Sequence, residues 1–304
     1  MIPIGEFDSI QFRWDSFVKY VNLVKEQVES GIPHKLLAKY AVDNNLSQQD
    51  IVHLSFLYGM TYSSISTIQM FEELHPGVDE YAWWEKNKSM LHFQNDKRYI
   101  KNMNQFAPAL GSYWKNSSEV FDAIMTMPYK KARSVCLKNL KFFGEHALYL
   151  MYDVLQIIYG DNFGSLPDKI QWTKTGATVA EGMYRLLGWD EKLPIKKKGI
   201  EPQMIPYLDQ QAQILAAVMD LSITDLESEL CAYAKLFKQT RYFGYYMDRH
   251  LGDLHEYENA PKHIIDMNYK FREDNIDKKY LGEFNDWNGI RKEKCKEFVL
   301  HGTI

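Results

Sequence analysis

Hydrophobic positions recur every three to four residues along nearly the whole chain, which is the spacing that places them on one face of an α-helix. No segment keeps the alternating pattern of a β-strand for long. The pattern therefore predicts an all-α protein with many helices. The segments with this spacing are residues 17–29, 34–42, 51–60, 62–74, 81–91, 113–127, 130–141, 145–159, 178–187, 209–219 and 226–254.

Local signals mark several helix ends. Ser47, followed three residues later by Asp50, is the pattern of an N-terminal capping box, and Gly188 stands where a helix-terminating glycine is expected. Residues 192–206 carry three prolines and four lysines, which is typical of a linker. We expect a single helical domain over residues 1–304, with a possible sub-boundary at 192–206.

Composition supports long helices in a soluble protein. The 17 glycines and 10 prolines fall below average usage, so turns are few, and an aromatic content of 14% excludes low-complexity disorder. Three distant cysteines predict neither disulfides nor a zinc site, and the N-terminus does not have the pattern of a signal peptide. The longest apolar run, residues 147–159, contains Asp153 and is too short to span a bilayer. We expect a cytoplasmic protein with no membrane partner.

Charge is segregated along the chain, although the net charge is only −4. Residues 40–85 contain seven acids and no lysine or arginine, whereas residues 129–144 contain five basic residues and no acid. A basic segment in an acidic protein can hold a polyanion at one place. The alternative is an ordinary solvated helix face.

The basic segment ends at Leu140, and a second helix follows Gly144 after a short turn. Free backbone N–H groups at the start of that helix suit a phosphate, and the basic side chains suit its neighbours. This arrangement predicts a helix–hairpin–helix-like element that binds DNA without reading bases. The alternative is two core helices joined by a glycine turn. The candidate DNA-binding residues are Lys130, Lys131, Arg133, Lys138, Lys141 and Gly144.

A second candidate site lies in the segment 239–249, interpreted as helical. Arg241, Tyr245, Asp248 and Arg249 are spaced to share one helix face. Two guanidinium groups beside a phenol and a carboxylate suit a pyrophosphate and a proton acceptor. The alternative is a helix at the edge of the core, with its arginines paired to carboxylates.

Two further features suit a nucleic-acid substrate. A polar cluster, Asp96-Lys97-Arg98-Tyr99, follows the tryptophan pair Trp83-Trp84. Trp83, Trp84, Trp172 and Trp189 are candidates for stacking on an extruded base, although tryptophans in helical proteins mostly belong to the core. The sequence contains no phosphate-binding P-loop, dinucleotide fingerprint or nucleophile elbow, so we expect neither a kinase nor a dehydrogenase.

The order of these motifs resembles a known family. The segment 57–62, the pair Trp83-Trp84 with residues 95–99, the hairpin 140–146, the segment 176–188 and the pattern 241–249 together resemble the bacteriophage amino acid:DNA transferases, also called α-glutamyl/putrescinyl-thymine pyrophosphorylases. The resemblance covers about residues 50 to 295. It implies a fold distantly similar to the helix–hairpin–helix DNA glycosylases, and a host-cell cytoplasmic location for a viral protein.

The resemblance also implies an activity. Such enzymes act on double-stranded DNA in which 5-hydroxymethyluracil carries pyrophosphate, and a free amino acid displaces the pyrophosphate from the 5-methylene carbon. Arg241, Arg249, Arg98 and Lys97 would bind the pyrophosphate. Asp248 or Asp96 would accept the proton of the amine, and Asp168 would stabilise cationic character at the methylene. Tyr245 is a further candidate catalytic residue. We expect no cofactor and no metal. The alternatives are a non-catalytic helical DNA-binding protein and a relative of the DNA glycosylases.

Overall fold

The computed structural model describes residues 9–27, 31–91, 102–160, 163–164, 166–172, 177–190, 200–238, 241, 244–257 and 259–276. These residues form thirteen α-helices and a short 3₁₀-helix, and no strand occurs among them. The predicted all-α class is therefore confirmed. In this part of the chain, no helix combines the length and the apolar character needed to cross a lipid bilayer.

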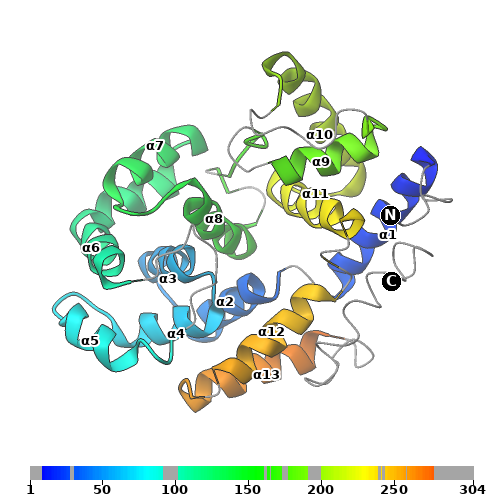
Figure 1. The fold of residues 1–304 in the computed structure, drawn as a ribbon. Helices are drawn as coiled ribbons and strands as arrows, with labels where there is room; N and C mark the ends of the chain where they lie inside the picture. Colours follow the sequence, from blue (N-terminus) through cyan, green and yellow to red (C-terminus); the bar gives the residue numbers. More distant parts are fainter. Residues whose placement is uncertain are drawn as a thin grey trace. The chain divides into compact units, whose positions relative to one another are not determined.

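Figure 1 labels the described helices in chain order. In chain order they are α1 Ile10–Gln27, α2 Ile32–Asp43, α3 Gln48–Thr61, α4 Ser64–Glu73, α5 Glu80–Asn87, α6 Met103–Thr126, α7 Tyr129–Asn139, α8 Glu145–Tyr159, α9 Ala177–Leu186, η3 Pro202–Met204, α10 Ile205–Met219, α11 Ile223–Phe237, α12 Tyr245–Glu256 and α13 Lys262–Asn275. The prediction of a helix over 145–159 is confirmed at both ends.

The described helices belong to two compact units. The first unit contains α1, α9, α10, α11 and the part of α12 that ends at Gly252. The second unit contains α2 to α8, the end of α12 from Asp253, and α13 as far as Asp274. The described residues 200–206 belong to the first unit. The single domain with a sub-boundary at 192–206 stays a prediction.

The core of the second unit is built around α3, which packs against both α4 and α8 (Figure 1). Every residue from Ile51 to Thr61 is buried except His53, so α3 is apolar on all sides, as a central helix must be. Gly59 permits the close approach of α8. A Cβ atom at this position would lie 2.5 Å from the carbonyl oxygen of Ala147.

Both ends of α3 are set by local chemistry. Ser47 and Asp50 form the predicted capping box, in which each side chain accepts the backbone N–H of the other residue. At the other end Tyr62 adopts a left-handed conformation with φ of +55°, and Ser63 then caps α4 by accepting the N–H of Ser66. The prediction of one helix over 62–74 is wrong at its start, because the chain turns at Tyr62 before α4 begins.

The centre of the first unit is the pair α9 and α11, against which α1 and α10 pack. Gly182 lies at the α9–α11 contact, where a Cβ atom would come within 2.2 Å of the carbonyl oxygen of Leu230. A polar network joins α1 to the pair. The Arg13 guanidinium donates to the Asp190 carboxylate, and the Tyr233 hydroxyl donates to the Arg13 carbonyl over 2.6 Å. These contacts connect segments that are more than 170 residues apart in the sequence.

The predicted helix over residues 226–254 is wrong as a continuous element. Helix α11 ends at Phe237, and α12 begins only at Tyr245. Gly244, immediately before α12, has φ of +88°, a conformation that interrupts a right-handed helix and that glycine adopts without strain. Hydrophobic spacing continued across this break because both helices bury one face.

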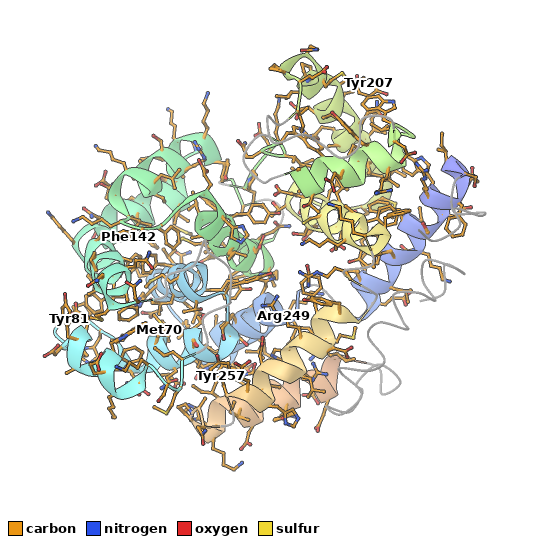
Figure 2. All side chains as sticks on the ribbon, viewed as in Figure 1. Met70, Tyr81, Phe142, Tyr207, Arg249 and Tyr257 are labelled. Carbon is orange, nitrogen blue, oxygen red and sulfur yellow. The ribbon has the colours of Figure 1, made fainter. Side chains whose placement is uncertain are left out.

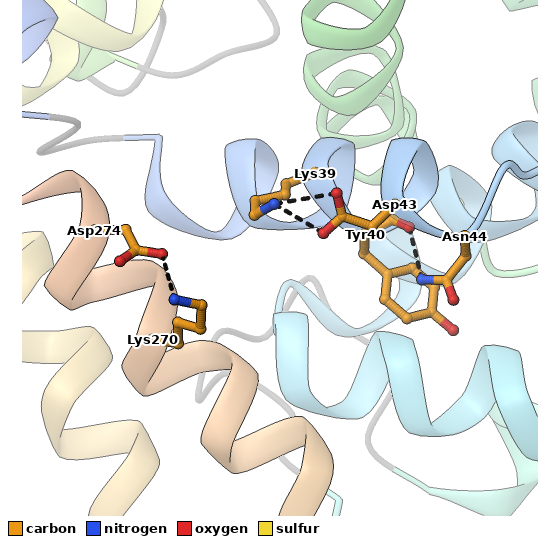
Figure 3. A network of polar contacts seen from close by, with 6 residues as sticks. All are labelled: Lys39, Tyr40, Asp43, Asn44, Lys270 and Asp274. Carbon is orange, nitrogen blue, oxygen red and sulfur yellow. Dashed lines mark hydrogen bonds and ion pairs between the residues drawn. The ribbon is translucent and has the colours of Figure 1, made fainter.

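Helix α13 lies beyond the last helix expected from the sequence, and it belongs to the second unit. A buried hydrogen bond of 2.8 Å from Ser64 Oγ to Asn268 Oδ1 holds it against α4. Its exposed face carries the ion pair Lys270–Asp274, and α2 carries a similar pair, Lys39–Asp43 (Figure 3). Each of these exposed pairs contributes about 0.5 kcal/mol or less, so the buried hydrogen bond is the stronger constraint on α13.

Candidate functional site

Helix α7 is amphipathic, with a basic outer face. Tyr129, Ala132 and Cys136 are buried at spacings of three and four residues. The exposed side chains of the helix are three lysines and a serine, and Lys141 follows in the next turn. Side chains with nitrogen at their tips extend outward from α7 in Figure 2. We define the basic face as Lys130, Lys131, Lys138 and Lys141, none of which forms an ion pair with another described residue.

Arg133 differs from the other predicted DNA-binding residues. Its guanidinium binds the Glu145 carboxylate in the first turn of α8 through two hydrogen bonds, one of them 2.7 Å long from Nε. This bidentate pair connects α7 to α8. Glu145 also places a negative charge where the partial positive charge of the α8 N-terminus favours one. Arg133 therefore pairs with a carboxylate of the same protein, and we do not count it as part of the basic face.

The turn between α7 and α8 has an unexpected conformation. Phe142 adopts the left-handed region with φ of +56°, whereas Gly144 is extended at φ −90° and ψ −177° as the residue before α8. The turn lies in the segment expected from the sequence, and its left-handed residue is Phe142 and not the glycine. A Cβ atom at Gly144 would meet nothing within 4 Å, so the fold does not require a glycine there. A helix–hairpin–helix element stays a prediction.

Side chains from α6 hold the base of this turn. Ser112 Oγ accepts the backbone N–H of Lys141 over 2.9 Å, and Asn116 Nδ2 donates to the carbonyl of Asn139 over 3.2 Å. These bonds satisfy backbone groups that the end of α7 would otherwise leave without partners. The turn is consequently fixed in position relative to α6.

Arg241 and Tyr245 are close together, but for a different reason than predicted. Arg241 precedes α12, so the four residues do not share one helix face, and that prediction is wrong for Arg241. Its guanidinium instead stacks on the ring of Tyr245, 3.6 Å from the centroid, and lies 4.9 Å from the centroid of Tyr246. Asp248 and Arg249 lie in the first turns of α12 and are partly buried. The structure thus places a cation against two phenols at the start of α12.

The remaining predicted site residues belong to other segments of the chain. Asp168 is exposed, and its backbone carbonyl accepts a hydrogen bond from Gln213. Asp168 and the α12 residues belong to the first unit, whereas the basic face belongs to the second. Asp96, Lys97 and Arg98 lie outside the described residues. Within the described chain, no three His, Cys, Asp or Glu side chains are grouped to hold a metal ion.

Three of the four candidate base-stacking tryptophans belong to the core. Trp83 and Trp84 are buried against Phe106, with ring centroids 5.8 Å and 4.8 Å away. Trp172 is also buried, and its indole N–H donates to Asp209 over 2.8 Å. Trp189 is only partly buried. For the first three, the core alternative is confirmed.

Sequence reasoning missed a partly buried polar cluster in the second unit. His34 Nε2 lies 2.9 Å from the Tyr58 hydroxyl and 3.5 Å from an Asp153 carboxylate oxygen. Desolvation, reinforced by the nearby charge of Lys35, lowers the pKa of His34 to about 3. The signal for this cluster was Asp153 itself, a carboxylate within the apolar run 147–159, since a buried carboxylate needs a partner.

A second histidine, His53, is partly buried and is expected to make stability depend on pH. His53 stacks on Tyr113 at a centroid distance of 5.1 Å, and burial lowers the pKa of His53 to about 4 from an ordinary value of 6.5. Below pH 6.5 the unfolded chain therefore binds a proton at His53 that the folded chain excludes. We expect the free energy of unfolding to fall as the pH drops from about 6.5 to about 4.

The variant His53→Phe keeps an aromatic ring against Tyr113 and removes the titration. Urea unfolding followed by circular dichroism at several pH values should show a shallower decline for this variant than for the wild type. His75, which is exposed, offers a matched control, because His75→Phe should leave the slope unchanged. Equal slopes for wild type and His53→Phe would contradict a His53 side chain that stays neutral in the folded protein.

Comparison of the chain with protein-family models, with curated proteins and with solved structures found no match.

Proposed function

We propose that this protein binds DNA through the basic face of α7 and transfers an amino acid to a modified base. The observation that supports DNA binding best is the basic face itself. It presents four ammonium groups without a carboxylate partner among the described residues, on a chain whose net charge is −4. Lysines held on one helix face suit the regularly spaced phosphates of a duplex. Contacts of this kind position a protein on DNA and do not select a sequence.

The proposed reaction follows from the resemblance stated above. The amine nitrogen of the amino acid forms a bond to the 5-methylene carbon of the base, and the bond from that carbon to the pyrophosphate oxygen breaks. The pyrophosphate leaves with the electron pair, and the proton of the amine passes to a carboxylate. Catalysis of this kind consists of holding the reactants and stabilising the charge of the leaving group.

The chain offers groups for each of these roles. Arg241 and Arg249 are the described cations proposed to bind the leaving pyrophosphate, together with Lys97 and Arg98. Stacking on Tyr245 supports this role for Arg241, because it holds the guanidinium in one orientation. Asp248, three residues after Tyr245, is proposed to take the proton, with Asp96 as the alternative, and Asp168 to stabilise cationic character at the methylene.

One experiment separates the proposed activity from its alternatives. Duplex DNA containing pyrophosphorylated 5-hydroxymethyluracil is incubated with the protein and a pool of amino acids, digested to nucleosides and weighed by mass spectrometry. A nucleoside heavier than that of 5-hydroxymethyluracil by the mass of an amino acid residue supports the transferase. Release of free base identifies a glycosylase relative. An unchanged digest from a protein that still binds the duplex identifies a non-catalytic DNA-binding protein.

The variant Arg241→Ala should lower the release of pyrophosphate from this DNA by at least about a hundredfold, because removing one charge-stabilising donor has effects of that size. Circular dichroism should remain that of the wild type, since Arg241 lies outside α12. Lys270→Ala removes an exposed cation on α13 and serves as the control with unchanged release. Full activity of Arg241→Ala would exclude this residue from the site.

A further inference from the structure

Phe142 has two unusual properties at the tip of the α7–α8 turn. Its side chain is 57% exposed, and Figure 2 shows it at this turn. Its φ of +56° lies in the left-handed region, which a bulky residue without a side-chain hydrogen bond adopts only with strain. Glycine would adopt the same backbone without strain, and aspartate or asparagine nearly so. The turn therefore keeps an exposed phenyl ring at a position where folding alone favours another residue.

The residues on both sides of Phe142 are fixed. Leu140 is buried, and the backbone N–H of Lys141 is bound by Ser112 Oγ over 2.9 Å. Phe143 is buried as well and stacks on Phe56 with a centroid distance of 5.0 Å. Phe142 thus projects from a turn whose neighbouring residues are fixed. Little further ordering is therefore needed when its ring enters an apolar site.

Charge around the ring indicates the kind of partner. Lys141 precedes Phe142 directly and Lys138 lies in the last turn of α7, and both lysines are exposed. A polyanion with apolar layers between its charges matches this arrangement, and duplex DNA is such a polymer. Apolar side chains that enter a base step part the stacked bases and kink the duplex, while neighbouring cations hold the phosphates.

We propose that Phe142 is a wedge that inserts between stacked bases of the DNA bound by the basic face. This inference rests on the proposed function and deepens it, since an enzyme that reacts at a base must take that base out of the stack. The phosphates bind the lysines, and the ring fills the space that the displaced base leaves. Affinity then comes from the lysines, and distortion of the duplex comes from Phe142.

The test uses duplex DNA containing 2-aminopurine, whose fluorescence rises when the base unstacks. The full-length protein should bind this duplex and raise the fluorescence several-fold. Phe142→Ala and Phe142→Gly should bind with a dissociation constant within about tenfold of wild type, because phosphate contacts supply most of the affinity. Both variants should fail to raise the fluorescence. Tyr81→Ala is the matched control, because Tyr81 is an aromatic residue 60% exposed on α5, and it should behave as wild type.

Phe142→Gly also separates loss of the wedge from loss of folding. Because glycine relieves the backbone strain, this variant should unfold at a higher urea concentration than the wild type while losing the fluorescence response. A wild-type protein that binds the duplex without changing its fluorescence overturns the wedge and leaves DNA binding intact. The same conclusion follows if Phe142→Ala retains the full response. A wild-type protein that does not bind the duplex overturns the proposed function and the wedge together.

Discussion

Replacing Gly182 by alanine is expected to lower the free energy of unfolding by about 3 kcal/mol, at the upper end of the range for overpacking a core. The added Cβ would lie 2.2 Å from the carbonyl oxygen of Leu230 and 2.9 Å from its carbonyl carbon. Both atoms belong to the backbone of α11, so relief requires one helix to move away from the other. The contact between α9 and α11 is the centre of the first unit, and its other side-chain contacts would loosen with it.

Gly111→Ala is the matched control for this prediction. Gly111 is also inside a helix, but a Cβ there would meet nothing within 4 Å. Alanine at this position should therefore raise stability by about 0.5 to 1 kcal/mol, through the difference in helix propensity alone. Urea unfolding monitored by circular dichroism measures both variants. Equal changes in the free energy of unfolding at the two positions would show that helix propensity, and not the close approach of α9 to α11, determines the effect of alanine at Gly182.

The double variant Lys138→Glu/Lys141→Glu is expected to weaken duplex binding by at least about tenfold at moderate salt, similarly for all sequences. Each lysine that neutralises a phosphate adds about 0.9 to the slope of log affinity against log salt, so the slope should fall by about 2. Both residues are exposed outside the contact of α7 with α6 and α8, so the fold should persist. Fluorescence anisotropy of labelled duplexes across a salt series provides the measurement.

Lys262→Glu/Lys270→Glu changes the net charge by the same amount within the same unit and serves as the control. Both lysines are exposed on α13, where each pairs with an aspartate four residues later. This control should retain wild-type affinity at 0.15 M salt, where separated surface charges are largely screened. If the two double variants lose affinity equally, net charge and not the basic face would account for binding.

Much of the fold could be predicted from the sequence, because helix periodicity is a local property. The helix over 145–159 and the capping box at Ser47 and Asp50 both follow from residues within four positions of one another. The predictions that were wrong concern the places where two helices meet. Tyr62 and Gly244 interrupt segments whose hydrophobic spacing continues across the break, since consecutive helices can bury faces that remain in phase.

The candidate site was predicted less well than the fold. The basic face could be predicted, because a run of lysines on one helix side is exposed wherever the apolar side is buried. Arg133 could not be assigned correctly, because its partner Glu145 lies on another helix. The proximity of Arg241 and Tyr245 was expected from helical spacing, but it results from a stacking contact across the turn before α12.

The sequence by itself determined the helical class, the location of most helices and the segregation of charge. These properties depend on residues that lie near one another in the chain, where spacing and composition are sufficient. Only the tertiary structure decided which aromatic side chains are buried, and that Phe142 rather than Gly144 carries the left-handed turn of the α7–α8 connection. Those outcomes depend on Ser112, Asn116 and Phe56, whose contacts with this turn link positions 23 to 87 residues apart. Packing between distant segments, and not local pattern, selects them.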